Sequence, residues 1–157
     1  MPLNRKKATR PPPEAGNAAL RLLTRREHSA KELKRKLTAR GVDTAAADAA
    51  IEKLAGSGFQ SDSRYAEQMI RTRLAQGYGP RRIRADLQVA GLTHERIEIA
   101  LAGIDIDWHE QAQAAFAKRF ETVGGTHAER QKQYRFLAGR GFDSDQIRAA
   151  LNADFDE

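Results

Sequence analysis

The sequence predicts an all-α protein made of three tandem three-helix repeats, arranged as an elongated array whose curvature the sequence leaves open. The first observation is a pattern that recurs every 50 residues without an insertion, as expected of a repeat architecture. Its clearest element is a leucine followed four residues later by a glycine: Leu37 and Gly41, Leu87 and Gly91, and Leu137 and Gly141. The second observation is that no segment shows the two-residue alternation of a β-strand. Together they predict the fold class.

Each leucine–glycine pair is typical of a helix that ends in a Schellman motif. Glycine just after the helix adopts the left-handed conformation at little steric cost. The apolar residue after each glycine should then pack against the leucine; these residues are Val42, Leu92 and Phe142. The residue after that can cap the next helix; these are Asp43, Thr93 and Asp143. In that helix an apolar pair at positions i and i+4 predicts a buried stripe: Ala47 with Ile51, Ile97 with Leu101, and Ile147 with Leu151.

Start signals locate the remaining helices. Capping boxes are expected at Ser29 with Glu32 and at Thr126 with Glu129. In the second repeat Gly79-Pro80 takes the same register, with proline at the first helical position. The opening helices of the repeats are expected at about 17–26, 63–76 and 107–121. This organisation gives a disordered basic tail over residues 1–16, and repeats over 17–60, 61–106 and 107–157.

The charge is distributed unevenly along the chain. The net charge is +6, yet residues 1–40 carry +9 and residues 101–157 carry −3. A basic N-terminal part suggests a polyanion or an acidic protein surface as partner; the alternative is that lysine and arginine only solvate the helix faces. No apolar run approaches the length needed to span a bilayer. Pro11-Pro12-Pro13 stand where a signal peptide would have its apolar segment, so we expect a cytoplasmic protein.

The sequence offers no candidate catalytic site. It contains no cysteine, which excludes disulfides and thiolate chemistry. Its four histidines lack metal-ligand spacing, so we expect them to be surface or capping residues. The segment Gly77-Tyr78-Gly79-Pro80 lacks the Lys-Ser/Thr of a phosphate-binding loop. We therefore expect a protein that is not an enzyme and that uses no metal and no cofactor.

Basic side chains in the first two repeats are the candidate partner-binding residues. They are Lys31, Lys34, Arg35, Arg64, Arg71, Arg73, Arg81, Arg82 and Arg84, with Tyr78 as an aromatic neighbour. Arginine suits bidentate contacts to phosphate or carboxylate, so either nucleic acid or an acidic protein groove fits. Some arginines should instead pair with Glu67 or Asp86. Tyr78 could stack on a base or enter a partner's pocket, or it could lie at the core edge.

Several motifs, taken in order over residues 17–152, resemble the RecX family of recombination regulators. They are Arg26-x-x-Ser29-x-x-Glu32-Leu33-x-x-x-Leu37, Asp62-Ser63-Arg64-Tyr65-Ala66, Gly79-Pro80-Arg81-Arg82-Ile83, Leu87-x-x-x-Gly91-Leu92 and Arg140-Gly141-Phe142. The resemblance implies a monomeric helical array that docks in the groove of the RecA filament on single-stranded DNA. It also implies inhibition of filament growth, ATP hydrolysis and strand exchange, which would restrain recombination, DNA repair and the SOS response.

Two other functions remain compatible with the sequence. One is a free-standing nucleic-acid-binding protein, because helix pairs joined by a tight corner superficially resemble helix-turn-helix units. Against it, no corner shows a cluster of asparagine, glutamine and arginine that would read base edges. The other is an interaction scaffold with an unrelated partner. Affinity for bare DNA compared with recombinase-coated DNA separates the first of these from the regulator.

Overall fold

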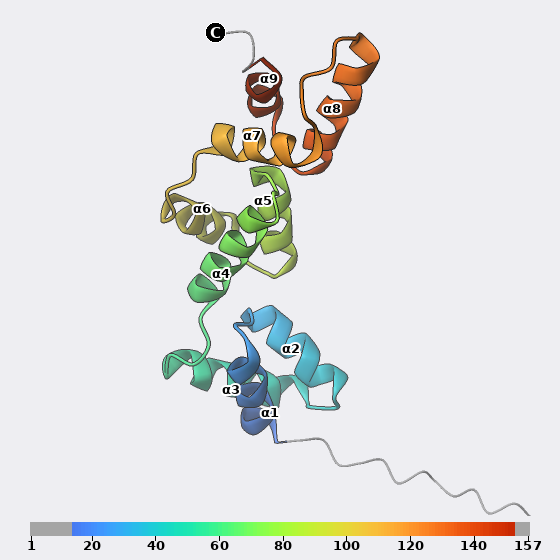
Figure 1. Ribbon diagram of the computed structural model, residues 1–157. Coiled ribbons are helices and arrows are strands. Elements are labelled where there is room, and N and C mark those ends of the chain that lie inside the picture. The colour runs from blue at the N-terminus through green and yellow to red at the C-terminus, as the bar shows by residue number, and fades with distance from the viewer. Residues whose placement is uncertain (1–13, 153–157) are drawn as a thin grey trace, which may run out of the picture. The chain divides into compact units, whose positions relative to one another are not determined.

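The computed structural model describes residues 14–152, and within this range the backbone forms nine helices and no strand (Figure 1). The described chain divides into two compact bodies, the first up to Asp62 and the second from Ser63 onward. The first body holds α1 (Ala15–Arg25), α2 (Ala30–Ala39) and α3 (Thr44–Gly56). The second holds α4 (Asp62–Ala75) from Ser63 onward, α5 (Pro80–Val89), α6 (His94–Ala102), α7 (Trp108–Arg119), α8 (His127–Gly139) and α9 (Ser144–Asn152). The predicted fold class is confirmed, while the predicted basic tail lies almost wholly outside the described residues.

All three glycine corners have the predicted Schellman geometry. The glycines lie at φ 90°, 94° and 96° for Gly41, Gly91 and Gly141. The amide after each glycine donates to the leucine carbonyl five residues earlier, at 3.1 Å from Val42 to Leu37, 3.2 Å from Leu92 to Leu87 and 3.2 Å from Phe142 to Leu137. Each glycine amide donates to the carbonyl three residues before it. One local device therefore ends the second helix of every repeat.

Most of the predicted caps are present. Thr126 and Glu129 form a complete capping box. Of the capping box predicted at Ser29, the structure has the hydroxyl that accepts the amide of Glu32, while the Glu32 carboxylate pairs with Arg26 and Lys36. Thr93 caps α6, and the Asp143 carboxylate accepts the amide of Gln146 at the start of α9. The prediction for Asp43 is wrong. Its exposed carboxylate accepts no hydrogen bond from the first backbone amides of α3, so these amides are left to bind solvent.

Each repeat has its own apolar core, built from the stripes that the sequence predicts, so the second body holds two cores. In the first body, α1 and α2 pack against α3 around Leu33, Leu37 and Ile51. In the second body, α7 and α9 pack closely and bury Phe116 and Ile147. Trp108, at the start of α7, packs against the core of the second repeat. The second and third repeats therefore form one body.

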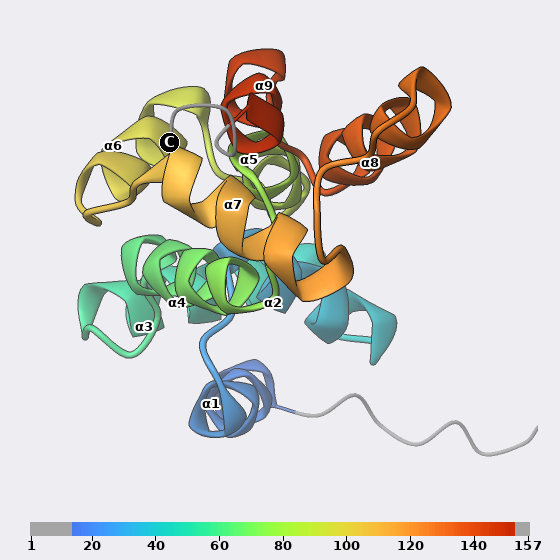
Figure 2. The same ribbon diagram turned by 45° about the horizontal axis from the view of Figure 1, so that its top comes forward.

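A backbone contact also joins the second and third repeats. The amide of Gly79 donates to the carbonyl of Arg140 at 2.8 Å, and the amide of Arg81 donates to the carbonyl of Gly141 at 2.9 Å. The start of α5 consequently lies against the corner between α8 and α9 (Figure 2). A Cβ on Gly79 would lie 2.7 Å from the Gly141 carbonyl oxygen, so the approach requires glycine. We call this contact the glycine junction.

Gly139 offers a stabilising change close to this junction. It is the last residue of α8, where an added Cβ would meet no atom within 4 Å. Alanine there loses less backbone entropy on folding than glycine, so Gly139→Ala should raise the free energy of unfolding by about 0.5–1 kcal/mol. Urea unfolding monitored by circular dichroism measures this change. A loss of stability would show that the glycine has a role that its open surroundings do not indicate.

Candidate partner-binding surface

The first body presents two unengaged cations on α2. Lys31 and Arg35 are exposed, one turn apart, and neither side chain has a carboxylate partner within residues 14–152. The third predicted cation of this helix differs from them. Lys34 reaches the carboxylate of Asp48 on α3 at 3.0 Å and helps to join the two helices. The candidate surface on this helix therefore consists mainly of Lys31 and Arg35.

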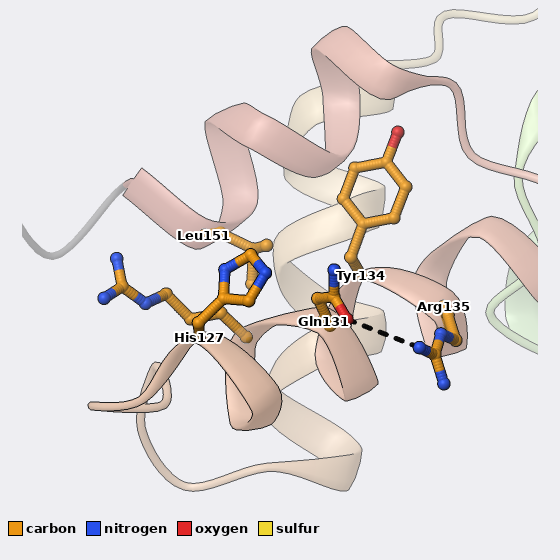
Figure 3. Close-up of a pocket in the computed structure, with 6 residues that line it drawn as sticks. His127, Gln131, Tyr134, Arg135 and Leu151 are labelled. Atoms are coloured by element: carbon orange, nitrogen blue, oxygen red, sulfur yellow. Dashed lines mark hydrogen bonds between the residues drawn. The ribbon is translucent and has the colours of Figure 1, made fainter.

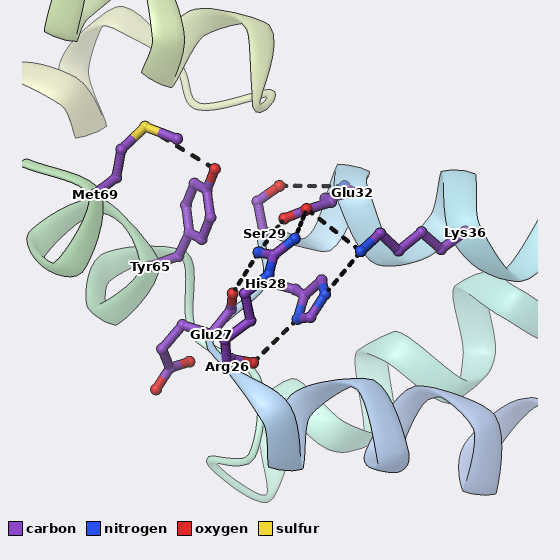
Figure 4. A network of polar contacts seen from close by, with 8 residues as sticks. All are labelled: Arg26, Glu27, His28, Ser29, Glu32, Lys36, Tyr65 and Met69. Atoms are coloured by element: carbon purple, nitrogen blue, oxygen red, sulfur yellow. Dashed lines mark hydrogen bonds and ion pairs between the residues drawn. The ribbon is translucent and has the colours of Figure 1, made fainter. Parts of the chain in front are cut away.

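A buried polar network, which no local motif of the sequence indicates, lies just before α2. His28 is 1% exposed, which corrects the expectation of a surface or capping histidine. Its Nδ1 lies 3.0 Å from the carbonyl oxygen of Arg26, and its Nε2 lies 3.2 Å from Nζ of Lys36 (Figure 4). The Glu32 carboxylate accepts hydrogen bonds from the Arg26 guanidinium. Burial is the largest influence on His28 and lowers its pKa below the ordinary value of 6.5.

The network also fixes the start of α2. The Gln60 side-chain amide donates to the carbonyl of His28 at 3.3 Å, and the amide of Ala30 donates to the Asp62 carboxylate at 2.9 Å. His28 has the same place in the 50-residue register as Tyr78. In both repeats this position therefore lies beside hydrogen bonds to main-chain groups at the start of the second helix, made by side chains in the first repeat and by backbone in the second.

Most predicted arginines of the second repeat are engaged in ion pairs. Arg73 and Arg82 both bind Asp86, at 2.8 and 3.2 Å. Arg71 binds Glu67 at 3.1 Å, so the expected pairing with Glu67 and Asp86 is confirmed. Arg84 binds Glu98 on α6 at 2.7 Å, and this hydrogen bond is the main cause of the lowered pKa of the Glu98 carboxyl. The Arg73–Asp86 and Arg84–Glu98 pairs join neighbouring helices, whereas the other two pairs lie within one helix. All four leave part of the arginine side chain exposed.

Arg81 differs from its neighbours. It is exposed, and its guanidinium has no ion-pair partner within the described part of the chain. Arg64 is exposed near the start of α4. Tyr78 lies at the edge of the second-repeat core, which is one of the two alternatives that the sequence left open. The guanidinium carbons of Arg82 and Arg140 lie 4.8 and 5.0 Å from its ring centre.

A shallow cavity of about 380 Å³ opens between α8 and α9 (Figure 3). Its lining is an apolar floor with a basic rim: His127, Arg130, Gln131, Tyr134, Arg135 and Leu151. Gln131 accepts a hydrogen bond from Arg135, and no carboxylate lines the cavity. Between residues 14 and 152 there is no group of three or more side chains that could hold a metal ion. No helix in that range is both long enough and apolar enough to cross a membrane.

The fold and this surface define a helical-repeat protein whose exposed helices carry arginine and lysine. Family models match all three repeats: the first, second and third three-helix domains of RecX match residues 15–54, 61–101 and 105–151. The chain belongs to the RecX family.

Individual relatives agree with this assignment. The chain is 48% identical over 140 residues to the regulatory protein RecX of Stenotrophomonas maltophilia (strain R551-3), covering 88% of this chain and 86% of that protein. It is 46% identical over the same length, with the same coverage, to the regulatory protein RecX of Xanthomonas campestris pv. campestris (strain B100). The crystal structure of RecX from Lactobacillus salivarius has the same fold, with a TM-score of 0.75 at 24% identity over 88% of this chain and 93% of that one.

Proposed function

We propose that this protein binds the groove of the RecA filament on single-stranded DNA and inhibits filament growth, ATP hydrolysis and strand exchange. The observation that carries the proposal is the match of all three repeats to RecX models, together with relatives that bear the name regulatory protein RecX. In this role the protein acts in the cytoplasm as a monomer, by binding alone, without catalysis or a cofactor. Recombination, DNA repair and the SOS response are the processes it would modulate.

The surface supports this proposal because it carries both cations without an ion-pair partner and cations already paired within the protein. Lys31, Arg35 and Arg81 are exposed and unengaged, so they can meet the phosphates and carboxylates of a filament without breaking an internal pair. The paired arginines keep N–H groups in solvent and can contribute less. They are Arg71, Arg73, Arg82 and Arg84. We therefore place the main filament contacts at Lys31, Arg35 and Arg81, with Lys34, Arg64 and Tyr78 beside them.

Charge reversal at Arg81 tests the proposal. Because Arg81 is exposed and its side chain supports no neighbour, Arg81→Glu should leave the fold intact while placing a negative charge against the filament. We expect the concentration that half-inhibits the DNA-dependent ATPase of RecA to rise by about tenfold, which corresponds to about 1.4 kcal/mol. The matched control is Lys132→Glu, another exposed cation of the second body that lies outside the proposed contacts. It should inhibit like the parent protein.

Two results would contradict the proposal. If Arg81→Glu inhibited RecA as well as the parent protein does, the second repeat would not be part of the filament contact. Tighter binding of the parent protein to bare single-stranded DNA than to RecA-coated DNA, at near-physiological salt, would favour the free-standing nucleic-acid-binding protein instead.

A further inference from the structure

Three arginines and three aromatic rings alternate along one strip of the second body. The Arg140 guanidinium lies between two rings, with its central carbon 5.0 Å from the Tyr78 ring centre and 5.4 Å from that of Phe136. Arg119 lies 5.9 Å from the ring centres of both Phe136 and Phe120. At the other end, Arg82 covers Tyr78 at 4.8 Å. We call the six residues Arg82, Tyr78, Arg140, Phe136, Arg119 and Phe120 the stacked strip.

The strip exists because the glycine junction brings two repeats together. Tyr78 and Arg82 flank the start of α5, whereas Arg140 caps the end of α8. The hydrogen bond from the Gly79 amide to the Arg140 carbonyl fixes their spacing at backbone level. Phe120 and Phe136 then meet edge to face at 5.4 Å, which holds the end of α7 against α8. The strip is therefore a preorganised surface rather than a set of independent side chains.

The charges of the strip are only partly neutralised. Arg82 shares Asp86 with Arg73. The guanidiniums of Arg119 and Arg140, by contrast, have no carboxylate partner within residues 14–152, and their contacts there are with rings. A guanidinium stacked on a ring keeps its N–H donors at its edge, free to point outward. Both guanidiniums belong to residues 101–157, a region whose net charge is −3.

We propose that the stacked strip binds the phosphodiester backbone of nucleic acid, with Arg119 and Arg140 donating to successive phosphates. Planar guanidiniums held by stacking lose little freedom when they make two-pronged hydrogen bonds to phosphate oxygens. Such contacts bind without reading the base sequence. This inference adds a site across the second and third repeats to the proposed function and does not depend on RecA, because the strip should bind nucleic acid alone.

The strip suits phosphate better than an acidic protein. Protein interfaces centre on an apolar or aromatic anchor that enters a pocket of the partner. Here guanidiniums cover the faces of Tyr78 and Phe136, and none of the strongly exposed large apolar side chains belongs to the strip. The strip thus presents guanidiniums stacked on rings, and no exposed apolar or aromatic side chain that could anchor a protein partner.

The test uses the full chain, no recombinase, and a fluorescein-labelled oligo(dT) of about 20 nucleotides, with anisotropy recorded at several salt concentrations. Arg119→Ala with Arg140→Ala should weaken binding about tenfold or more. The plot of log affinity against log salt, whose slope is negative, should also become less steep by about 1.4, because each lost single-strand phosphate contact removes about 0.7 from the slope's magnitude. The control, Lys132→Ala with Arg148→Ala, removes the same positive charge from two other exposed residues of the second body, of which Arg148 pairs with Asp145, and should change neither quantity.

Two further arms separate charge from stacking and phosphate from carboxylate. Arg119→Lys with Arg140→Lys should restore most of the salt slope but not the affinity, since lysine keeps the charge and loses the planar fork. Polyglutamate should compete only weakly for the parent protein. The proposal is overturned if the alanine pair binds oligo(dT) like the parent, if the lysine pair regains full affinity, or if polyglutamate competes as well as unlabelled oligo(dT).

Discussion

Replacing Gly141 with alanine is expected to lower the free energy of unfolding of the second body by about 2–5 kcal/mol. Two costs add at this residue. Its φ of 96° is a conformation that costs an L-residue about 1–2 kcal/mol. The new Cβ would also lie 2.5 Å from the amide nitrogen of Arg82, and relieving such overpacking costs about 1–3 kcal/mol. Because that neighbour is backbone, α5 must move, and urea unfolding of the full chain measures the loss.

Two other glycines separate these costs. Gly77 has φ 81°, but an added Cβ would meet nothing closer than the Ala115 Cβ at 3.8 Å, so Gly77→Ala should show the conformational cost alone. Gly79 has an ordinary φ of −94°, yet its Cβ would lie 2.5 Å from the Phe142 amide nitrogen. Gly79→Ala should therefore show the packing cost alone. Equal losses for Gly77→Ala and Gly141→Ala would mean that the glycine junction contributes nothing to stability.

The glycine corners could be predicted from the sequence because all their determinants are local. A leucine, a glycine and an apolar residue within six positions specify the whole Schellman motif, and the 50-residue period repeats that information three times. The second role of Gly141 could not be predicted in the same way. It depends on the approach of Gly79, 62 residues earlier, and nothing in either local motif distinguishes Gly141 from Gly41 or Gly91.

The ion pairs of the candidate surface differ in the same way: the sequence predicts those between residues close along the chain and not those between distant ones. The pairing of Arg82 with Asp86 follows from their four-residue spacing on one helix, as does that of Arg71 with Glu67. The pairing of Arg84 with Glu98 needs the angle between α5 and α6, which the sequence does not specify. Arg119 and Arg140 could not be recognised from the sequence for a further reason. Their significance lies in aromatic neighbours from other helices, not in a local cluster of charge.

Lowering the pH from 7 to 5 is expected to weaken the first body through His28. In the folded chain the neutral imidazole donates from Nδ1 to the Arg26 carbonyl and accepts at Nε2 from the Lys36 ammonium. Burial, aided by the nearby charges of Arg26 and Lys36, lowers the pKa of His28 below 6.5, while the hydrogen bond to the Arg26 carbonyl and the charge of Glu32 act in the opposite direction. The unfolded chain therefore takes up this proton at a higher pH than the folded chain. The contribution to stability is complete above about pH 6.5 and falls by about 1.4 kcal/mol per pH unit until the lowered pKa is reached.

A proton NMR titration of the His28 ring reports the folded pKa directly, and urea unfolding at several pH values reports the slope. His28→Asn should remove the part of the slope between pH 5 and 7 that belongs to this residue. Lys36→Met removes the ammonium that faces Nε2 but keeps an apolar stem, so the pKa of His28 should rise and the slope should span a narrower range of pH. A folded His28 that titrates at or above pH 6.5 would contradict the neutral, buried imidazole, because the two charged neighbours and the 1% exposure all disfavour the proton.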